Sequence, residues 1–185
     1  MINVVLILDE TGSMTVRQKE TVEQFEDYIK KLKKHKKVKD IRFTLTRFNS
    51  QKLDIYYDKV KLNKVKALDD YIPDHFTPLY DAIGKTINSI DSNKCIMAVL
   101  TDGLENASTE FTLKDIIKLI EDKKEIGWEF VFLAVGLDEM QAERIFNTPV
   151  AASMNMGIKG TTISGLTQSY YVETLSYIDK NSSSG

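Results

Sequence analysis

The fold of this chain is decided by one stretch near its beginning, Ile2-Asn3-Val4-Val5-Leu6-Ile7-Leu8-Asp9-Glu10-Thr11-Gly12-Ser13. The apolar run does not alternate with polar residues, which is typical of a central parallel strand with both faces covered. Asp9, Thr11 and Ser13 follow the run within one tight turn. The stretch therefore predicts a buried strand whose carboxyl end presents a carboxylate and two hydroxyl groups.

Other parts of the chain repeat this pattern and alternate with helical spacing. Apolar residues recur every three or four positions in the segments 22–32, 79–90 and 113–120, as they do on the buried face of a helix. Two more apolar runs, 96–100 and 130–135, predict further central strands.

A hairpin interrupts this alternation. The runs 41–48 and 52–57 are strand-like and are joined by Asn49-Ser50-Gln51. We expect the second run to lie antiparallel at one edge of the sheet.

The order of these elements predicts an α/β fold. We expect a doubly wound (Rossmann-like), mostly parallel six-stranded sheet with one antiparallel edge strand and helices on both faces. The last strand is expected around Met154 and Met156. We predict a single domain over residues 1–180, followed by a disordered tail at 181–185.

Composition excludes several classes of protein. Hydrophobic residues make up 42% and charged residues 28% of the 185 residues, as in an ordinary soluble domain. The net charge of −2 argues against a nucleic-acid footprint over the whole surface. With Cys95 as the sole cysteine, no disulfide forms within the chain, and no leader or membrane span is recognisable. We expect a cytoplasmic protein that contacts no membrane.

Oxygen-bearing side chains follow a second predicted strand and open a predicted helix. Thr101-Asp102-Gly103 closes the run 96–100, and Thr77 precedes Pro78 where a helix should begin, as a cap would. The carboxyl ends of parallel strands meet at one edge of a sheet, so these groups should join Asp9. A set of only oxygen ligands suits a hard cation, here Mg²⁺, with Mn²⁺ or Ca²⁺ as alternatives.

The pattern Asp9-x-Thr11-x-Ser13, then Thr77, then Thr101-Asp102-Gly103 resembles the metal-ion-dependent adhesion site of von Willebrand factor A (vWA) domains. Two further runs, 77–82 and 102–107, are similar to those of bacterial and phage intracellular vWA proteins. The resemblance implies that Thr11 and Ser13 bind the metal directly. It also implies that Thr77 binds directly or through water, and that Asp9 and Asp102 hold waters or hydroxyls.

The resemblance further implies a protein partner. Ligands that are mostly neutral hydroxyls leave the cation's charge poorly balanced, and in vWA modules an acidic residue of the partner supplies the missing anionic oxygen. The residues expected to contact the partner are Glu10, Phe76 and Glu105. An AAA+ ATPase is a candidate partner, as for some intracellular vWA proteins.

Two alternatives to this function remain at this stage. The chain is a structural or assembly scaffold with an incidental metal site, or a metal-assisted phosphohydrolase. The second is disfavoured because Thr11 stands where a haloacid-dehalogenase-type phosphatase needs an acid two residues after Asp9. His75 is interpreted as a surface loop residue rather than a catalytic base. The lysine run 30–39 lacks interleaved aromatic residues, so nucleic-acid binding is not expected.

Overall fold

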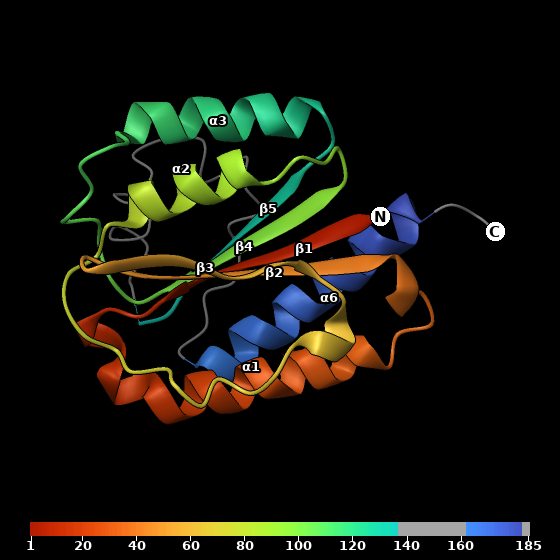
Figure 1. The fold of residues 1–185 in the computed structure, drawn as a ribbon, viewed down its shortest axis with the longest axis horizontal. Helices are drawn as coiled ribbons and strands as arrows, with labels where there is room; N and C mark the ends of the chain where they lie inside the picture. Colours follow the sequence, from red (N-terminus) through yellow and green to blue (C-terminus); the bar gives the residue numbers. More distant parts are fainter. Residues whose placement is uncertain (137–161, 183–185) are drawn as a thin grey trace.

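A computed structural model describes residues 1–136 and 162–182 of the chain (Figure 1). In chain order, the elements are β1 (Ile2–Asp9), η1 (Gly12–Arg17), α1 (Gln18–Lys33), η2 (Val38–Asp40), β2 (Ile41–Asn49), β3 (Lys52–Val60), η3 (Leu62–Lys64), α2 (Leu79–Ser89), β4 (Cys95–Thr101), α3 (Leu113–Glu125), β5 (Glu129–Ala134) and α6 (Ile163–Asn181).

The sheet has the order β3-β2-β1-β4-β5. β1 pairs in parallel with both β2 and β4, and β5 is parallel to β4. β3 pairs antiparallel with β2, which confirms the predicted hairpin at the sheet edge. The described residues form five strands, not the six that we predicted. The sixth strand, expected around Met154 and Met156, lies outside the described residues.

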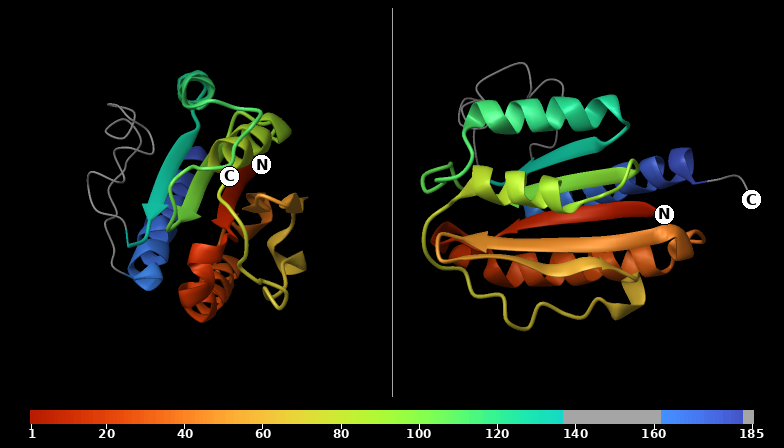
Figure 2. Two further views of the ribbon diagram at one scale, coloured as in Figure 1. Left: turned by 90° about the vertical axis from the view of Figure 1, so that its left-hand side faces the viewer. Right: turned by 45° about the horizontal axis from the view of Figure 1, so that its top comes forward.

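Helices cover both faces of the sheet, with α1 and α6 on one side and α2 and α3 on the other (Figures 1 and 2). β1 shows why its sequence is apolar from Val4 to Leu8. Val4, Leu6 and Leu8 belong to the hydrophobic cluster on the α1/α6 side. Val5 and Ile7 belong to the cluster on the α2/α3 side. Because successive side chains of a strand point to opposite faces, a strand covered on both faces needs apolar residues at every position.

Two helix ends differ in how well the sequence predicted them. α3 ends at Glu125, and Gly127 follows with a positive φ of 97°, as expected of a glycine that terminates a helix. α2 begins at Leu79, and no side chain of the preceding residues caps it. The predicted cap at Thr77 was therefore wrong, and Thr77 lies in the loop before the helix. Asn181, which we assigned to the predicted tail, is the last residue of α6.

The topology has its switch point between β1 and β4. From β1 the chain first adds β2 on one side, and later returns to add β4 on the other side. In doubly wound sheets, ligands bind beside the carboxyl ends of the strands at such a switch point. Asp9 ends β1, and Asp102 follows the last residue of β4. Across the described ranges, none of the helices is long and apolar enough to span a membrane.

Candidate metal-binding site

Asp9, the last residue of β1, lies at this switch point and is fully buried. Its Oδ1 accepts a hydrogen bond from the backbone N–H of Thr11 at 2.8 Å. Its Oδ2 accepts a short hydrogen bond from the hydroxyl of Thr101, the last residue of β4. Asp9 therefore joins the ends of the two strands that flank the switch point, and it sets the direction in which the loop leaves β1.

A chain of hydrogen bonds runs from this loop to the end of β4. Ser13 Oγ donates to Asp102 Oδ1 at 2.5 Å, and Thr11 Oγ1 lies 3.2 Å from Ser13 Oγ. A hydroxyl has a single hydrogen to donate, so Thr11 is the donor to Ser13 when Ser13 donates to Asp102. The structure thus brings Thr11, Ser13 and Asp102 together as predicted.

Thr77 reaches the same place from a third loop. A methyl group added at Gly103 would lie 3.2 Å from Thr77 Oγ1 and 3.5 Å from Ser13 Oγ. The two hydroxyls therefore face the same small space in front of Gly103, and the absent side chain of the glycine keeps that space open. Thr77 is held there by its backbone, because its N–H donates to Asn106 Oδ1 at 2.8 Å and its C=O accepts from Asn106 N–H at 3.1 Å.

Burial changes the acidity of Asp9. Removal from water disfavours the charged carboxylate, and this raises the pKa of Asp9 to about 6, although hydrogen bonds from Thr101 and Thr11 act in the opposite direction. A nearby negative charge on Asp102 raises the pKa further. Two carboxylates that are buried close together repel each other, so the binding of a cation beside them is favoured.

Arg17 is a charged neighbour that the sequence analysis did not identify. Its Nε lies 3.4 Å from Asp102 Oδ2, and the Asp102 side chain is only 6% exposed. Arg17 Nε is buried and makes no hydrogen bond, so the contact is an ion pair without directional bonding. Arg17 lies at the end of η1, four residues after Ser13. Residues four apart on a helix lie on the same side, so this spacing is the sequence signal that Arg17 is close to the site.

Glu10 does not lie where a partner could contact it. Its carboxylate binds the guanidinium of Arg47 through two hydrogen bonds, from Nε at 2.9 Å and from Nη2 at 2.7 Å. The Arg47 side chain is fully buried and that of Glu10 is 5% exposed. Arg47, a charged residue within the buried strand β2, was the sequence signal for this pair, because a buried charge requires a partner.

The Glu10–Arg47 pair also holds the loop that carries Thr77. Arg47 donates to Asp70 Oδ1 and to the Asp70 C=O, both at 2.7 Å, and Ile72 N–H donates to Glu10 Oε1 at 3.1 Å. Farther along, Tyr71 Oη donates to the Asp9 C=O at 2.6 Å. The loop is therefore fixed against both β1 and β2 before it reaches Thr77.

Glu105 has a structural role that the sequence analysis did not anticipate. It accepts hydrogen bonds from the backbone N–H of Tyr80 at 3.0 Å, in the first turn of α2, and from Ala107 and Ser108 in its own loop. The helix is thus capped by a distant acidic residue, whose charge suits a helix N-terminus. Phe76, by contrast, is 67% exposed beside Thr77, as a partner-contacting residue should be.

His75 stays on the surface of this loop. It has a positive φ of 69°, and its C=O accepts the N–H of Gly12 at 3.0 Å. Its Nε2 lies 3.5 Å from Asp74 Oδ2, and its side chain is about one-third exposed. The histidine therefore fixes the backbone next to the site and is paired with its neighbour.

The donor set fits a hard cation. Over residues 1–136 and 162–182, no group of three His, Cys, Asp or Glu side chains is arranged to hold a metal. The assembled donors are instead the hydroxyls of Thr11, Ser13 and Thr77 beside the carboxylates of Asp9 and Asp102. The open space at Gly103, which a Cβ would fill, lies between two of these hydroxyls. Oxygen-only donors suit Mg²⁺ and not the softer transition metals.

Comparison with known proteins adds information on the fold. No family model matches the chain, and no curated protein sequence matches it. Among solved structures, the SpRpn10 VWA domain aligns with a TM-score of 0.55 at 11% identity, covering 80% of this chain and 81% of that domain. The chain therefore has a vWA-like fold.

Pilus proteins have similar folds. The pilus adhesin SpaC from Lactobacillus rhamnosus GG aligns with a TM-score of 0.68 at 13% identity, over 97% of this chain and 30% of that one. The PilB minor pilin from Streptococcus sanguinis aligns with a TM-score of 0.57 at 11% identity, over the whole of this chain and 63% of that one. This chain thus spans less than two-thirds of either pilus protein, and at these identities the likeness concerns the fold alone.

Proposed function

We propose that this protein is a divalent-metal-dependent protein-binding module that recognises an acidic residue of a partner protein. The metal is Mg²⁺, with Mn²⁺ and Ca²⁺ as alternatives. Thr11, Ser13 and Thr77 would hold the ion, with Asp9 and Asp102 in support. The observation that carries this proposal is the hydroxyl cluster itself, in which Ser13 lies within hydrogen-bond distance of both Thr11 and Asp102.

The charge of the site supports recognition of a carboxylate. The hydroxyl donors are neutral, and the carboxylate of Asp9 already accepts hydrogen bonds from Thr11 and Thr101. The carboxylate of Asp102 also forms an ion pair with Arg17. A divalent ion held in this way retains much of its positive charge, and an anionic oxygen from outside the chain would balance it. The bound metal supplies that electrostatic attraction.

The surroundings of the site support a protein as the ligand. Large apolar side chains are exposed on each of the loops that form the site, namely Val16 at 86%, Ile72 at 68%, Phe76 at 67% and Leu104 at 37%. Exposed apolar groups around a polar centre are typical of an interaction surface. A partner would bury these side chains while its carboxylate reaches the metal.

We propose that the protein binds its partner without catalysing a reaction, and that it does so in the cytoplasm. No positioned general acid accompanies Asp9, because the residue two positions later is Thr11. The lone cysteine, Cys95, is buried and free, as suits a reducing compartment. An AAA+ ATPase is one candidate partner, to be tested among the proteins that the metal-loaded module retains.

The first test measures metal binding directly. Mn²⁺ is titrated into the wild type, Ser13→Ala and Ser169→Ala, and free Mn²⁺ is followed by electron paramagnetic resonance. Ser169 is a matched control because its hydroxyl bonds only the Gly165 C=O within α6. We expect Ser13→Ala to weaken binding by about tenfold or more and Ser169→Ala to leave it unchanged. Equal binding by all three proteins would reject the site.

The second test concerns the partner. Proteins retained by the wild type in Mg²⁺, by the wild type in EDTA, and by Asp9→Ala in Mg²⁺ are compared. A protein present only in the first sample supports metal-dependent recognition. A protein present in all three samples supports the scaffold alternative. Hydrolysis of a phosphoester in Mg²⁺ that is lost in Asp9→Ala would instead make the protein a phosphohydrolase.

A further inference from the structure

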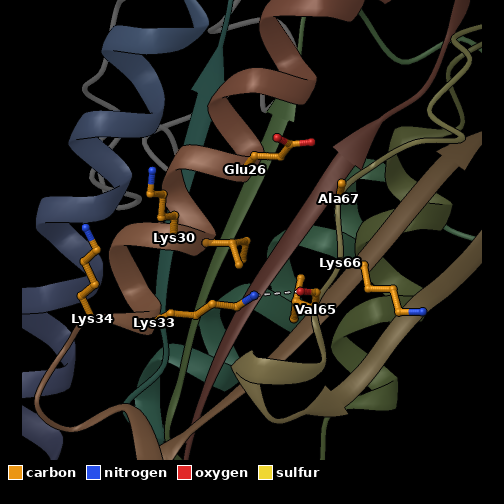
Figure 3. Close-up of a pocket in the computed structure, with 8 residues that line it drawn as sticks. Glu26, Lys30, Lys33, Lys34, Val65, Lys66 and Ala67 are labelled. Atoms are coloured by element: carbon orange, nitrogen blue, oxygen red, sulfur yellow. Dashed lines mark hydrogen bonds between the residues drawn. The ribbon is translucent and has the colours of Figure 1, made fainter.

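A groove lies between the second half of α1 and the segment that follows η3, away from the metal site (Figure 3). Its volume is about 370 Å³. Figure 3 shows Lys30 and Lys33 on α1, Lys34 directly after its end, and Lys66 on the opposite segment; Lys33 reaches across the groove, and the other three side chains point outward from its two sides. Its remaining lining residues are Glu26, Ile29, Val65 and Ala67.

The groove has a fixed shape. Lys33 crosses it, and its Nζ donates to the Val65 C=O at 2.9 Å (Figure 3). Ile29 and Val65 are buried members of the core cluster on this face of the sheet. The floor is therefore aliphatic and rigid, while the rim is cationic.

The lysines of the rim are not neutralised by the protein itself. Lys31 and Lys37, on the same helix and the turn after it, pair with Asp27 at 2.6 Å and Asp179 at 3.2 Å. In the described part of the chain, Lys30, Lys34 and Lys66 have no carboxylate within ion-pair distance. Glu26 is the one acid among the lining residues. The rim thus carries positive charge that is free to bind an anionic ligand.

A second hollow of about 540 Å³ continues this surface. It shares Lys33 with the groove, and its other lining residues are Met1, Val38, Lys39, Arg42, Lys61, Leu62 and Asn63. The same combination recurs there, with apolar residues at the base and cations around them. Together the two hollows form a continuous basic surface on a protein whose net charge is −2.

We propose that this surface binds an acidic segment of a partner protein, with an apolar side chain of that segment seated on Ile29, Val65 and Ala67. Carboxylates on either side of the apolar residue would pair with Lys34 on one bank and Lys66 on the other. Electrostatic complementarity of this kind favours acidic partners and accelerates association. This second interaction surface needs no metal.

The lining favours a peptide over a nucleic acid. Single-stranded nucleic acids bind where aromatic side chains or guanidinium planes stack on their bases. The groove of Figure 3 is lined by neither. The one arginine of the neighbouring hollow, Arg42, has its Nη1 bonded to the C=O groups of Lys39 and Ile41. An aliphatic floor suits a leucine or phenylalanine side chain.

The test uses fluorescein-labelled peptides and fluorescence anisotropy, in EDTA throughout so that the metal site is silent. The probe carries aspartates and glutamates around one leucine. One comparison peptide replaces the acids by their amides, and another replaces the leucine by serine. An oligothymidylate of matched charge is the fourth ligand. We expect only the acidic leucine peptide to bind well, and its affinity to fall with added salt.

Two double variants locate the binding. Lys34→Glu with Lys66→Glu should weaken the peptide about tenfold, since both banks of the groove then repel it. Lys114→Glu with Lys118→Glu makes the same change of charge on the exposed side of α3 and should have little effect. Circular dichroism confirms that both variants are folded. Equal weakening by the two variants, equal binding of the amide peptide, tighter binding of the oligothymidylate, or no binding at all would overturn the proposal. None of these results would bear on the metal site.

Discussion

Glu10 and Arg47 form a buried ion pair directly beside the candidate metal site. Glu10 follows the last residue of β1, and Arg47 lies near the end of the neighbouring strand β2. Two hydrogen bonds of 2.9 and 2.7 Å join their side chains. Since Glu10 lies between Asp9 and Thr11, the pair fixes the point at which the ligand-bearing loop leaves the sheet.

Removing one member of this pair should destabilise the protein strongly. We expect Glu10→Gln to lower the free energy of unfolding by about 3 kcal/mol, because it leaves the Arg47 charge buried with only Asp70 to balance it. Combining it with Arg47→Met should recover part of that loss, as an apolar replacement has no charge to desolvate. Urea unfolding of both single variants and the double variant measures the coupling. Additive losses in the double variant would show that the pair is not coupled.

Gly103→Ala should impair metal binding and leave stability nearly unchanged. The added methyl would stand 3.2 Å from Thr77 Oγ1 and 3.5 Å from Ser13 Oγ, in the space between the two hydroxyls. We expect Mn²⁺ affinity to fall about tenfold or more, by calorimetric titration. Gly165→Ala is the control, since its methyl meets only Thr162 Oγ1 at 3.5 Å in α6. Unchanged affinity in Gly103→Ala would show that the metal does not bind beside this glycine.

Asp9 should make the metal-free protein less stable as the pH rises toward neutrality. Its pKa is raised from 3.8 to about 6 by burial, so the folded state keeps a proton that the unfolded state has already lost. The stability from that proton is fully present below a pH of about 3.8 and is lost as the pH rises through about 6. In EDTA at about pH 7, Asp9→Asn should therefore be more stable than the wild type by about 1–3 kcal/mol.

Urea unfolding at several pH values checks this prediction. The wild type should lose stability relative to Asp9→Asn as the pH rises from about 4 to about 7. A constant difference between the two proteins over that range would show that the Asp9 carboxyl has an ordinary pKa.

Gly84→Ala should destabilise α2, although alanine has the higher helix propensity. A methyl group at this position would lie 2.6 Å from the ring of Phe111. The ring cannot retreat easily, since the backbone N–H groups of Phe111 and Glu110 both donate to Asp81 Oδ1 at 2.9 Å. We expect a loss of about 1–3 kcal/mol in thermal or urea unfolding. The double variant Gly84→Ala, Phe111→Leu should recover part of it, and no recovery would exclude the ring as the cause.

The parts of the fold set by local pattern could be predicted from the sequence. The apolar runs gave the central strands, and Asn49-Ser50-Gln51 between two strand-like runs gave the hairpin. The positions of Asp9 and Asp102 followed from the rule that parallel strands end at one edge. The site residues Thr11, Ser13 and Asp102 came together for the same reason.

Contacts between distant loops could not be predicted in this way. Glu10 is adjacent in sequence to Asp9 and Thr11, Glu105 follows Asp102 by three residues, and both were expected to face a partner. Their orientations depend instead on Arg47 and on the first turn of α2, which are remote in the chain. The spacing of apolar residues predicts which face of a helix or strand is buried. It does not predict which hydrogen-bond donors a carboxylate in a loop will contact. The buried charge of Arg47 was the one available hint.

The length of β1 has a consequence for how two partners would be arranged. Its eight residues, Ile2–Asp9, extend over about 25 Å. The site residues follow its last residue, whereas the hollow lined by Met1 borders its first. A strand paired on both sides cannot stretch or bend appreciably, so the two surfaces keep a constant separation. A ligand of a few residues would occupy one surface only, and proteins bound at both would be held a fixed distance apart.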